Sequence, residues 1–285
     1  MKNIKFTKVQ GLGNDFLIIP VDDVSNLNSP GDLAIKMCER NYGAGADGII
    51  FVAPSQNPNA DFTSRIFNAD GSEPEISGNG TRCVAAYLYH QNRWAESEVK
   101  INTVAGIKTG RLVSRDELQY EFEFDMGAPK LTSAEIPIIL DSPLSQVVNH
   151  PLKMGGDIQR ITCVSMGNPH CTTFWSSFDD VNIDELGPLL EHHPAFPMRT
   201  NVEFVRIISR NEIEVRFWER GVGRTLSSGT GSSGASIAAM LNGFVDRNIS
   251  VKTQGGTLKV HWRDDNLVML TGSAAAIYEG IWLAK

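Results

Sequence analysis

The chain has 285 residues, a formal net charge of −7 and an isoelectric point near 5.4. It has no block of like charge and no cluster of lysine and arginine, which argues against nucleic acid or an anionic membrane surface as a partner. No apolar run approaches the ~18 residues of a membrane span, so we expect a cytoplasmic protein, and the length suggests two domains. Four cysteines without CxxC spacing predict reduced thiols, with neither a zinc site nor a disulfide framework.

Strand and helix signals alternate along the chain. Apolar runs bounded by turn residues predict strands at 15–20, 48–52, 62–67, 99–103, 112–114 and 120–125, and helices at 31–40 and 83–88. The second half repeats this composition, with strands expected at 161–165, 171–175, 202–208, 212–218, 250–253, 257–262 and 267–271, and helices at 184–191 and 234–242. Residues 129–150, rich in Pro, Ser and Leu, are predicted to form the crossing between two lobes.

An internal repeat organises these elements. The turn Ser-Gly-x-Gly occurs at 77–80 and again at 228–231, each time after a strand and before a helix of small residues. Gly13-Asn14 and Gly167-Asn168 recur at nearly the same spacing of about 150 residues. We therefore predict an α+β fold of two pseudo-symmetric lobes, each a curled, mostly antiparallel sheet around a central helix. The expected boundaries are 1–128 plus 273–285 for the N-terminal lobe and 129–272 for the C-terminal lobe, with a site at their interface.

The two Gly-rich turns are candidate anion sites. A helix that opens on such a turn leaves backbone N–H groups unpaired at the positive end of its dipole. Two such turns, one in each half of the chain, favour a single anionic ligand that binds to both. The sequence therefore predicts a small-molecule site rather than a surface for a macromolecule.

Other motifs are weaker. Residues 43–48 fit GxGxxG, but strand residues follow them where a dinucleotide-binding turn needs a helix. GxSxG is absent, which argues against a serine hydrolase. His192 and His193 precede a proline in a polar loop, where solvated side chains are the simpler interpretation than a metal site.

Polar residues at the ends of strands are candidate ligand contacts. Any one asparagine at such a place is more often a turn or cap residue, but the set recurs in both halves: Asn14, Asn68, Asn168 and Asn201. Glu219-Arg220 precedes a Gly-rich loop. The pair is either a surface ion pair or a guanidinium placed for a carboxylate.

These motifs together resemble the diaminopimelate epimerase family. The resemblance rests on residues 6–8, 11–16, 67–73, 78–83, 166–171, 219–221 and 229–231, in order and from end to end. It implies a two-domain fold with pseudo-twofold symmetry and inversion of an amino-acid α-carbon, interconverting LL- and meso-diaminopimelate without pyridoxal phosphate or another cofactor. It also implies two catalytic cysteines, each directly before a Gly-rich turn.

The chain departs from this pattern at both positions, where it has Ser77 and Ser228. Cys83, six residues after the first, should point into the packing. A serine hydroxyl is a far weaker acid than a thiol of pKa about 8.5, and no His or Lys lies nearby in sequence to activate it. Epimerisation is therefore expected to be weak or absent. Three interpretations stay open: a natural or engineered disabled epimerase, a paralogue that uses serines on another amino acid, and a protein that only binds.

The resemblance assigns roles residue by residue. Ser77 and Ser228 take the acid and base positions. The α-carboxylate would accept hydrogen bonds from the backbone N–H groups of Gly78, Asn79, Gly229 and Thr230. The distal amino and carboxylate groups would be held by Asn14, Asn68, Asn168, Asn201, Glu219 and Arg220. Gly48 stands where some members have a glutamine, and Tyr278 matches a tyrosine of the family's dimer contact, so a homodimer is possible.

Overall fold

The computed structural model describes residues 3–74 and 77–283. The chain divides into two compact units, Met1–Phe124 with Thr271–Lys285, and Asp125–Leu270. Within the described ranges, no helix is long and apolar enough to cross a bilayer.

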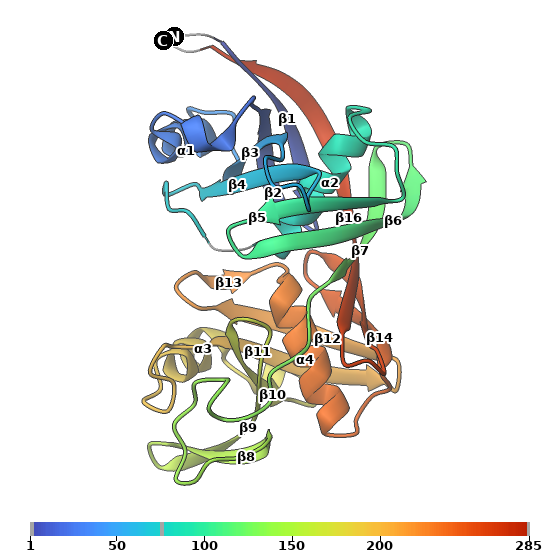
Figure 1. The fold of residues 1–285 in the computed structure, drawn as a ribbon. Coiled ribbons are helices and arrows are strands. Elements are labelled where there is room, and N and C mark those ends of the chain that lie inside the picture. Colours follow the sequence, from blue (N-terminus) through green and yellow to red (C-terminus); the bar gives the residue numbers. More distant parts are fainter. Residues whose placement is uncertain (1–2, 75–76, 284–285) are drawn as a thin grey trace. The chain divides into compact units, whose positions relative to one another are not determined.

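The first unit is a sheet closed on itself around one helix (Figure 1). Its strands are β1 (Ile4–Gly11), β2 (Asn14–Pro20), β3 (Gly48–Pro54), β4 (Phe62–Asn68), β5 (Glu98–Thr103), β6 (Gly106–Asp116), β7 (Gln119–Asp125) and β16 (Val268–Trp282). They neighbour one another in that order, and β16 also pairs with β1. Pairs β1–β2, β3–β4, β5–β6 and β6–β7 are antiparallel, whereas β2–β3 and β4–β5 are parallel. The helices are α1 (Pro30–Cys38), α2 (Gly78–His90) and the 3-10 turn η1 (Val24–Asn26).

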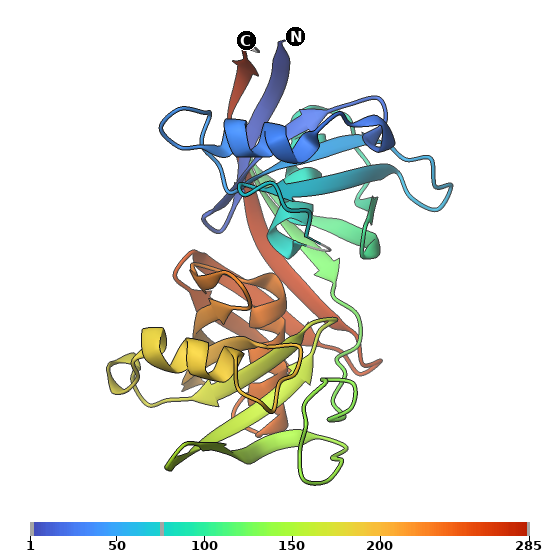
Figure 2. The ribbon, with the colours of Figure 1, turned by 90° about the vertical axis from the view of Figure 1, so that its left-hand side faces the viewer.

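Strand β2 shows why the helices lie on two sides of this sheet. Its residues 16–19 are all buried, which requires cover on both faces because successive side chains point in opposite directions. Leu17 and Ile19 pack with Met37 of α1 in one cluster. The alternate face meets α2, whose residues 79–89 are all buried. Helix α2 is thus the core of the unit, and α1 lies outside it (Figure 2).

The second unit repeats this plan. Its strands are β8 (Val147–Met154), β9 (Asp157–Ser165), β10 (Pro169–Phe174), β11 (Asn201–Ser209), β12 (Glu212–Glu219), β13 (Gly223–Thr225), β14 (Asn248–Thr253) and β15 (Gly256–Trp262). They neighbour in the order β15-β14-β12-β11-β10-β9-β8, with β13 on β12. Helix α4 (Gly229–Leu241) is buried inside, whereas α3 (Ile183–Glu191) packs outside through Ile183 and Leu190; η2 (Phe178–Asp180) is a 3-10 turn.

The predicted fold class is confirmed, with local corrections. Helix α2 begins at Gly78 instead of Cys83, because a serine cap starts the helix despite its glycines. The stretch 129–150 was predicted as a crossing only, but β8 begins at Val147 and pairs with β9. Strand β1 was missed, and β16 runs on to Trp282 because β1 supplies its hydrogen-bond partners.

Candidate active site

In the first unit, Ser77 caps the start of α2. Its backbone is extended, and its Oγ accepts a hydrogen bond from the Gly80 backbone N–H at 3.0 Å. A Cβ on Gly80 would lie 2.8 Å from Cδ1 of Ile66, so only glycine lets this turn approach β4 so closely. The hydroxyl therefore lies at the positive end of a buried helix.

Two of the predicted asparagines meet beside this cap. Asn14 begins β2, and its Oδ1 lies 3.4 Å from the Nδ2 of Asn79 in the first turn of α2. Its own Nδ2 donates to Asp47 Oδ2 at 2.7 Å. Both amides are therefore held near the Ser77 cap by a chain of side-chain hydrogen bonds.

The remaining predicted positions of this unit lie at the same edge of the sheet. Asn68 ends β4, is paired in register with Gly48, and donates from Nδ2 to Ser72 Oγ at 3.0 Å. A Cβ on Gly48 would lie 2.7 Å from the Phe67 carbonyl oxygen, so this backbone cannot accept a larger side chain without moving.

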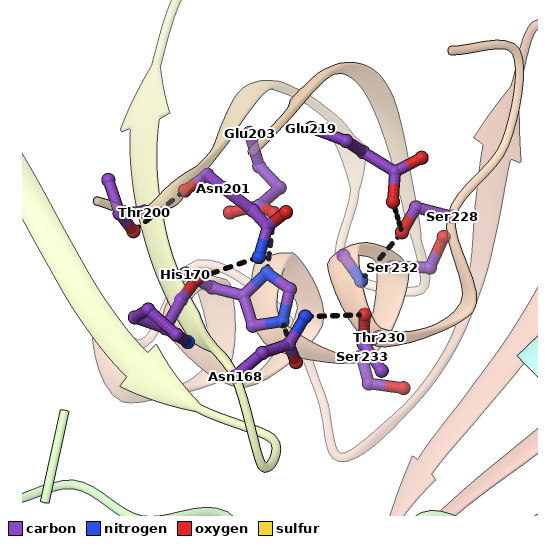
Figure 3. A network of polar contacts seen from close by, with 12 residues as sticks. Asn168, His170, Thr200, Asn201, Glu203, Glu219, Ser228, Thr230, Ser232 and Ser233 are labelled. Atoms are coloured by element: carbon purple, nitrogen blue, oxygen red, sulfur yellow. Dashed lines mark hydrogen bonds and ion pairs between the residues drawn. The ribbon is translucent and has the colours of Figure 1, made fainter. Parts of the chain in front are cut away.

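In the second unit, Ser228 caps α4 in the same way, but with a carboxylate beside it. Its Oγ accepts from the Gly231 N–H at 3.2 Å and donates to Glu219 Oε2 at 3.0 Å (Figure 3). The other oxygen of Glu219 accepts from Thr225 Oγ1 at 2.6 Å. Glu219 therefore accepts the hydrogen bond of the Ser228 hydroxyl, a contact that sequence spacing did not reveal.

A series of hydrogen-bonded polar side chains lies beside the first turn of α4 (Figure 3). His170 Nδ1 lies 2.7 Å from Glu203 Oε1, both side chains being 1% exposed, and its Nε2 lies 3.0 Å from Asn168 Oδ1. Asn168 Nδ2 in turn lies 3.4 Å from Thr230 Oγ1. Burial raises the pKa of the Glu203 carboxyl, and His170 opposes that rise. This series of hydrogen bonds fixes the amide of Asn168 against the first turn of α4.

The turn after β12 carries Arg220. Its backbone N–H donates to Asn201 Oδ1 at 3.0 Å, and its Nη1 donates to the Met198 carbonyl at 3.1 Å. Across the part of the chain that the structure describes, no ion pair joins Arg220 to Glu219, whose carboxylate accepts from Thr225 and Ser228. The guanidinium is anchored by backbone instead.

Glu191, at the end of α3, is hydrogen-bonded to this turn. It is 3% exposed, and it accepts from the Gly221 N–H at 2.9 Å and from Trp218 Nε1 at 2.8 Å. Neither Glu191 nor His170 was singled out by the sequence as a site residue. The signal for His170 was its place within segment 166–171, which contributes to the family resemblance.

The cysteines take no part in either cap. Cys38, Cys83, Cys163 and Cys171 are buried and free. Burial raises the pKa of Cys83 to about 12, and a Cβ on Gly11 would touch its sulfur at 3.4 Å. The expectation that Cys83 points into the packing is confirmed. His192 and His193 were expected as solvated side chains, but each ring lies within hydrogen-bond distance of a backbone carbonyl, that of Pro188 at 3.0 Å and that of Lys153 at 2.9 Å.

The helix start of each unit is suited to bind an anion. Backbone N–H groups of a first helical turn stabilise a carboxylate and the negative charge that develops on it when an adjacent C–H bond ionises. A hydroxyl at the cap can act as a base only after it has lost its own proton, and the Ser228 hydroxyl keeps its proton in a hydrogen bond to Glu219.

Comparison with known proteins agrees with this chemistry. The family profile for diaminopimelate epimerase matches residues 6–132 and 162–277. The diaminopimelate epimerase of Microcystis aeruginosa is 44% identical over 98% of this chain and 99% of its own length, and that of Pelotomaculum thermopropionicum 43% identical over 96% and 97%. A Bacillus anthracis phenazine biosynthesis protein of the PhzF family has a similar fold, with a TM-score of 0.68, 17% identity and full coverage of both chains. A hydroxyproline epimerase from Agrobacterium vitis, with bound trans-4-hydroxy-L-proline, also has a similar fold. Its TM-score is 0.68 and its sequence identity 15%, and the match covers 99% of this chain and 91% of the epimerase.

Proposed function

Because the chain belongs to the diaminopimelate epimerase family, we propose that it binds diaminopimelate and that Ser77 and Ser228 occupy the two proton-transfer positions. The observation that supports this is the matched pair of capped helices: each unit supplies one serine directly before a Gly-rich first turn. We propose that the two serines act on opposite sides of one α-carbon. Two acid–base groups are needed because inversion removes the proton from one face and returns it to the other.

The remaining predicted residues would bind the substrate. The α-carboxylate, and the charge that builds on it, would be stabilised by the first-turn N–H groups of Gly78, Asn79, Gly229 and Thr230. The distal amino and carboxylate groups would be bound by Asn14, Asn68, Asn168, Asn201, Glu219 and Arg220. Support comes from the fixed side chains: the asparagine amides are oriented by hydrogen bonds within their own unit.

Proton transfer by serines should be slow. Loss of a proton from an α-carbon demands a strong base, and a hydroxyl is almost entirely protonated at neutral pH. The Ser228 hydroxyl donates a hydrogen bond to Glu219 at 3.0 Å, and Ser77 Oγ accepts one from the Gly80 N–H, so neither contact removes the proton from a serine hydroxyl in the resting protein. We therefore expect the chain to bind diaminopimelate and to exchange its α-proton weakly or not at all.

The test is α-deuterium incorporation from deuterated water into LL-diaminopimelate. The chain as it stands is compared with Ser77→Cys/Ser228→Cys and with each single replacement. General acid–base groups contribute about 10²–10⁴-fold each, so the double variant should exchange at least about 10⁴-fold faster. Binding of diaminopimelate, followed by calorimetry, serves as the control that the substrate site is intact in every variant.

The outcomes separate the alternatives. Exchange confined to the double-cysteine variant identifies a disabled epimerase. Exchange by the unaltered chain identifies a serine-based enzyme. A double variant that binds diaminopimelate without exchange would refute the assigned positions, and a chain that binds another amino acid in its place would identify a paralogue.

We also propose a homodimer that uses the end of β16. Three apolar residues near the end of this strand are exposed: Ile277 by 50%, Tyr278 by 43% and Ile281 by 56%. Exposed apolar side chains close together on one strand favour association with a second copy. Its test is the mass in solution of Tyr278→Ala. A cytoplasmic location remains a prediction from composition.

A further inference from the structure

Arg82 is an unusual residue in the first unit. It lies in the second turn of α2 and is 1% exposed, and it heads the largest fully buried side chains of the described chain. Its Nη2 donates to Asn79 Oδ1 at 2.5 Å, and its Nε is buried without a hydrogen-bond partner. The side chain therefore reaches back along the helix toward the capped end, as helical side chains do.

The charge of Arg82 is not neutralised. Among the described residues, no carboxylate forms an ion pair with it. Burial lowers the pKa of its guanidinium to about 10, which still leaves the group charged at neutral pH. Burying a cation without a counter-ion is costly, and here the cation lies at a helix end that is already positive. An anion bound at the first turn would relieve both costs.

Arg82 also sets the direction of the asparagine network. A guanidinium can only donate, so Asn79 must turn its oxygen toward it and its Nδ2 toward Asn14 Oδ1. Asn14 must then donate its own amide to Asp47. The Arg82 guanidinium and the Asp47 carboxylate, at the two ends of this series of hydrogen bonds, thus fix the orientation of both amides.

The position on α4 that is equivalent to Arg82 carries a small neutral residue. Ser233 stands where Arg82 would be, and its hydroxyl donates to the Gly229 carbonyl at 3.0 Å. The titratable groups around that helix start are the buried His170–Glu203 pair and Glu219 beside the cap. The two caps thus have the same backbone motif but opposite electrostatic surroundings.

We propose that Arg82 is a positioning residue that orients Asn79 and Asn14 and favours a bound carboxylate and an ionised side chain at position 77. Position 228, next to the carboxylate of Glu219, would keep its proton. The two positions would then differ in the resting protein, one suited to act as the base and the other as the acid. This deepens the proposed function and rests on it for the roles of the two positions.

The experiment titrates the two positions as thiols. In Ser77→Cys/Ser228→Cys, the rate of alkylation by iodoacetamide is measured against pH at each cysteine by peptide mass spectrometry. The same titration is repeated with Arg82→Met and with Arg82→Gln, which is neutral but keeps a donor for Asn79. Ser233→Ala is the matched change on α4. The native cysteines are buried and serve as an internal check on folding.

We expect the thiol at position 77 to titrate below the thiol at position 228. Removing the charge of Arg82 should raise the pKa at position 77 by about one unit, and slow its alkylation at neutral pH about tenfold, with position 228 unchanged. Ser233→Ala should leave position 77 unchanged. An unshifted pKa at position 77 in a folded neutral variant, or equal shifts at both positions, would overturn the proposal. Because alkylation needs no turnover, an inactive protein with the expected titration would count only against the proposed function.

Discussion

Replacing Glu191 by alanine should both destabilise the second unit and weaken substrate binding. Glu191 is almost fully buried and accepts from the Gly221 N–H at 2.9 Å and from Trp218 Nε1 at 2.8 Å. A buried donor that loses its acceptor costs about 1–3 kcal/mol, so two of them should lower the free energy of unfolding by about 2–6 kcal/mol. This is a large share of the stability of an ordinary domain.

The effect on binding follows from where the turn lies. Gly221 follows Glu219 and Arg220 directly, and Arg220 is tied to the Asn201 side chain through its backbone N–H. A turn released from Glu191 would no longer hold both charged side chains in place. We expect the affinity for diaminopimelate to fall at least about tenfold, which corresponds to ~1.4 kcal/mol.

The assay is denaturant unfolding followed by circular dichroism, with calorimetric titration of diaminopimelate. Trp218→Phe is the matched control: it removes one donor, keeps an aromatic ring against Gly187, and should cost about 1–2 kcal/mol with little loss of affinity. Unaltered stability and affinity in Glu191→Ala would show that the two hydrogen bonds do not support the turn, and the reasoning would fail.

Two further predictions concern stability. Burial opposes ionisation of Asp15, but hydrogen bonds from two cationic side chains outweigh it and lower the pKa. The stabilisation by the ionised Asp15 is therefore complete above its unfolded pKa of about 4, and it is lost as the pH falls through the lower pKa of the folded state. In thermal unfolding, Asp15→Asn should lower the stability by about 1–2 kcal/mol at pH 7 and by little at pH 2. Gly234→Ala would place a Cβ 2.9 Å from Cγ of His170, so denaturant unfolding should show a loss of about 1–3 kcal/mol. Gly156→Ala faces open space and should change stability by less than about 0.5 kcal/mol; equal effects of the two glycine changes would contradict the packing argument.

Much of the fold was predictable because its strands carry local signals. Alternation and apolar runs located β2, β4 and β7 to within a residue or two. Strand β16 could not be bounded in this way, since Ala275 and Ala276 favour no strand by themselves and are paired there by β1. Helix α2 was placed too late because its first residues are poor helix formers that a cap and a close strand contact make possible.

The candidate site was predictable only where its residues belong to recurring segments. Ser77, Ser228 and the asparagines were found through the repeat and the resemblance. Arg82 and Glu191 were not, because a charged side chain in a helix usually faces solvent, and only tertiary packing shows that these two are buried. Glu219 was found, but its contact with Ser228 depends on β12 and α4 converging in space.

The serine caps have a consequence for the durability of the fold. Each hydroxyl oxygen accepts a hydrogen bond from a backbone N–H of the first helical turn, that of Gly80 or that of Gly231. Serine is among the residues that cap a helix best in this way. A thiol accepts hydrogen bonds poorly. Replacing both serines by cysteine should therefore lower the thermal stability of the molecule, whatever it does to the chemistry.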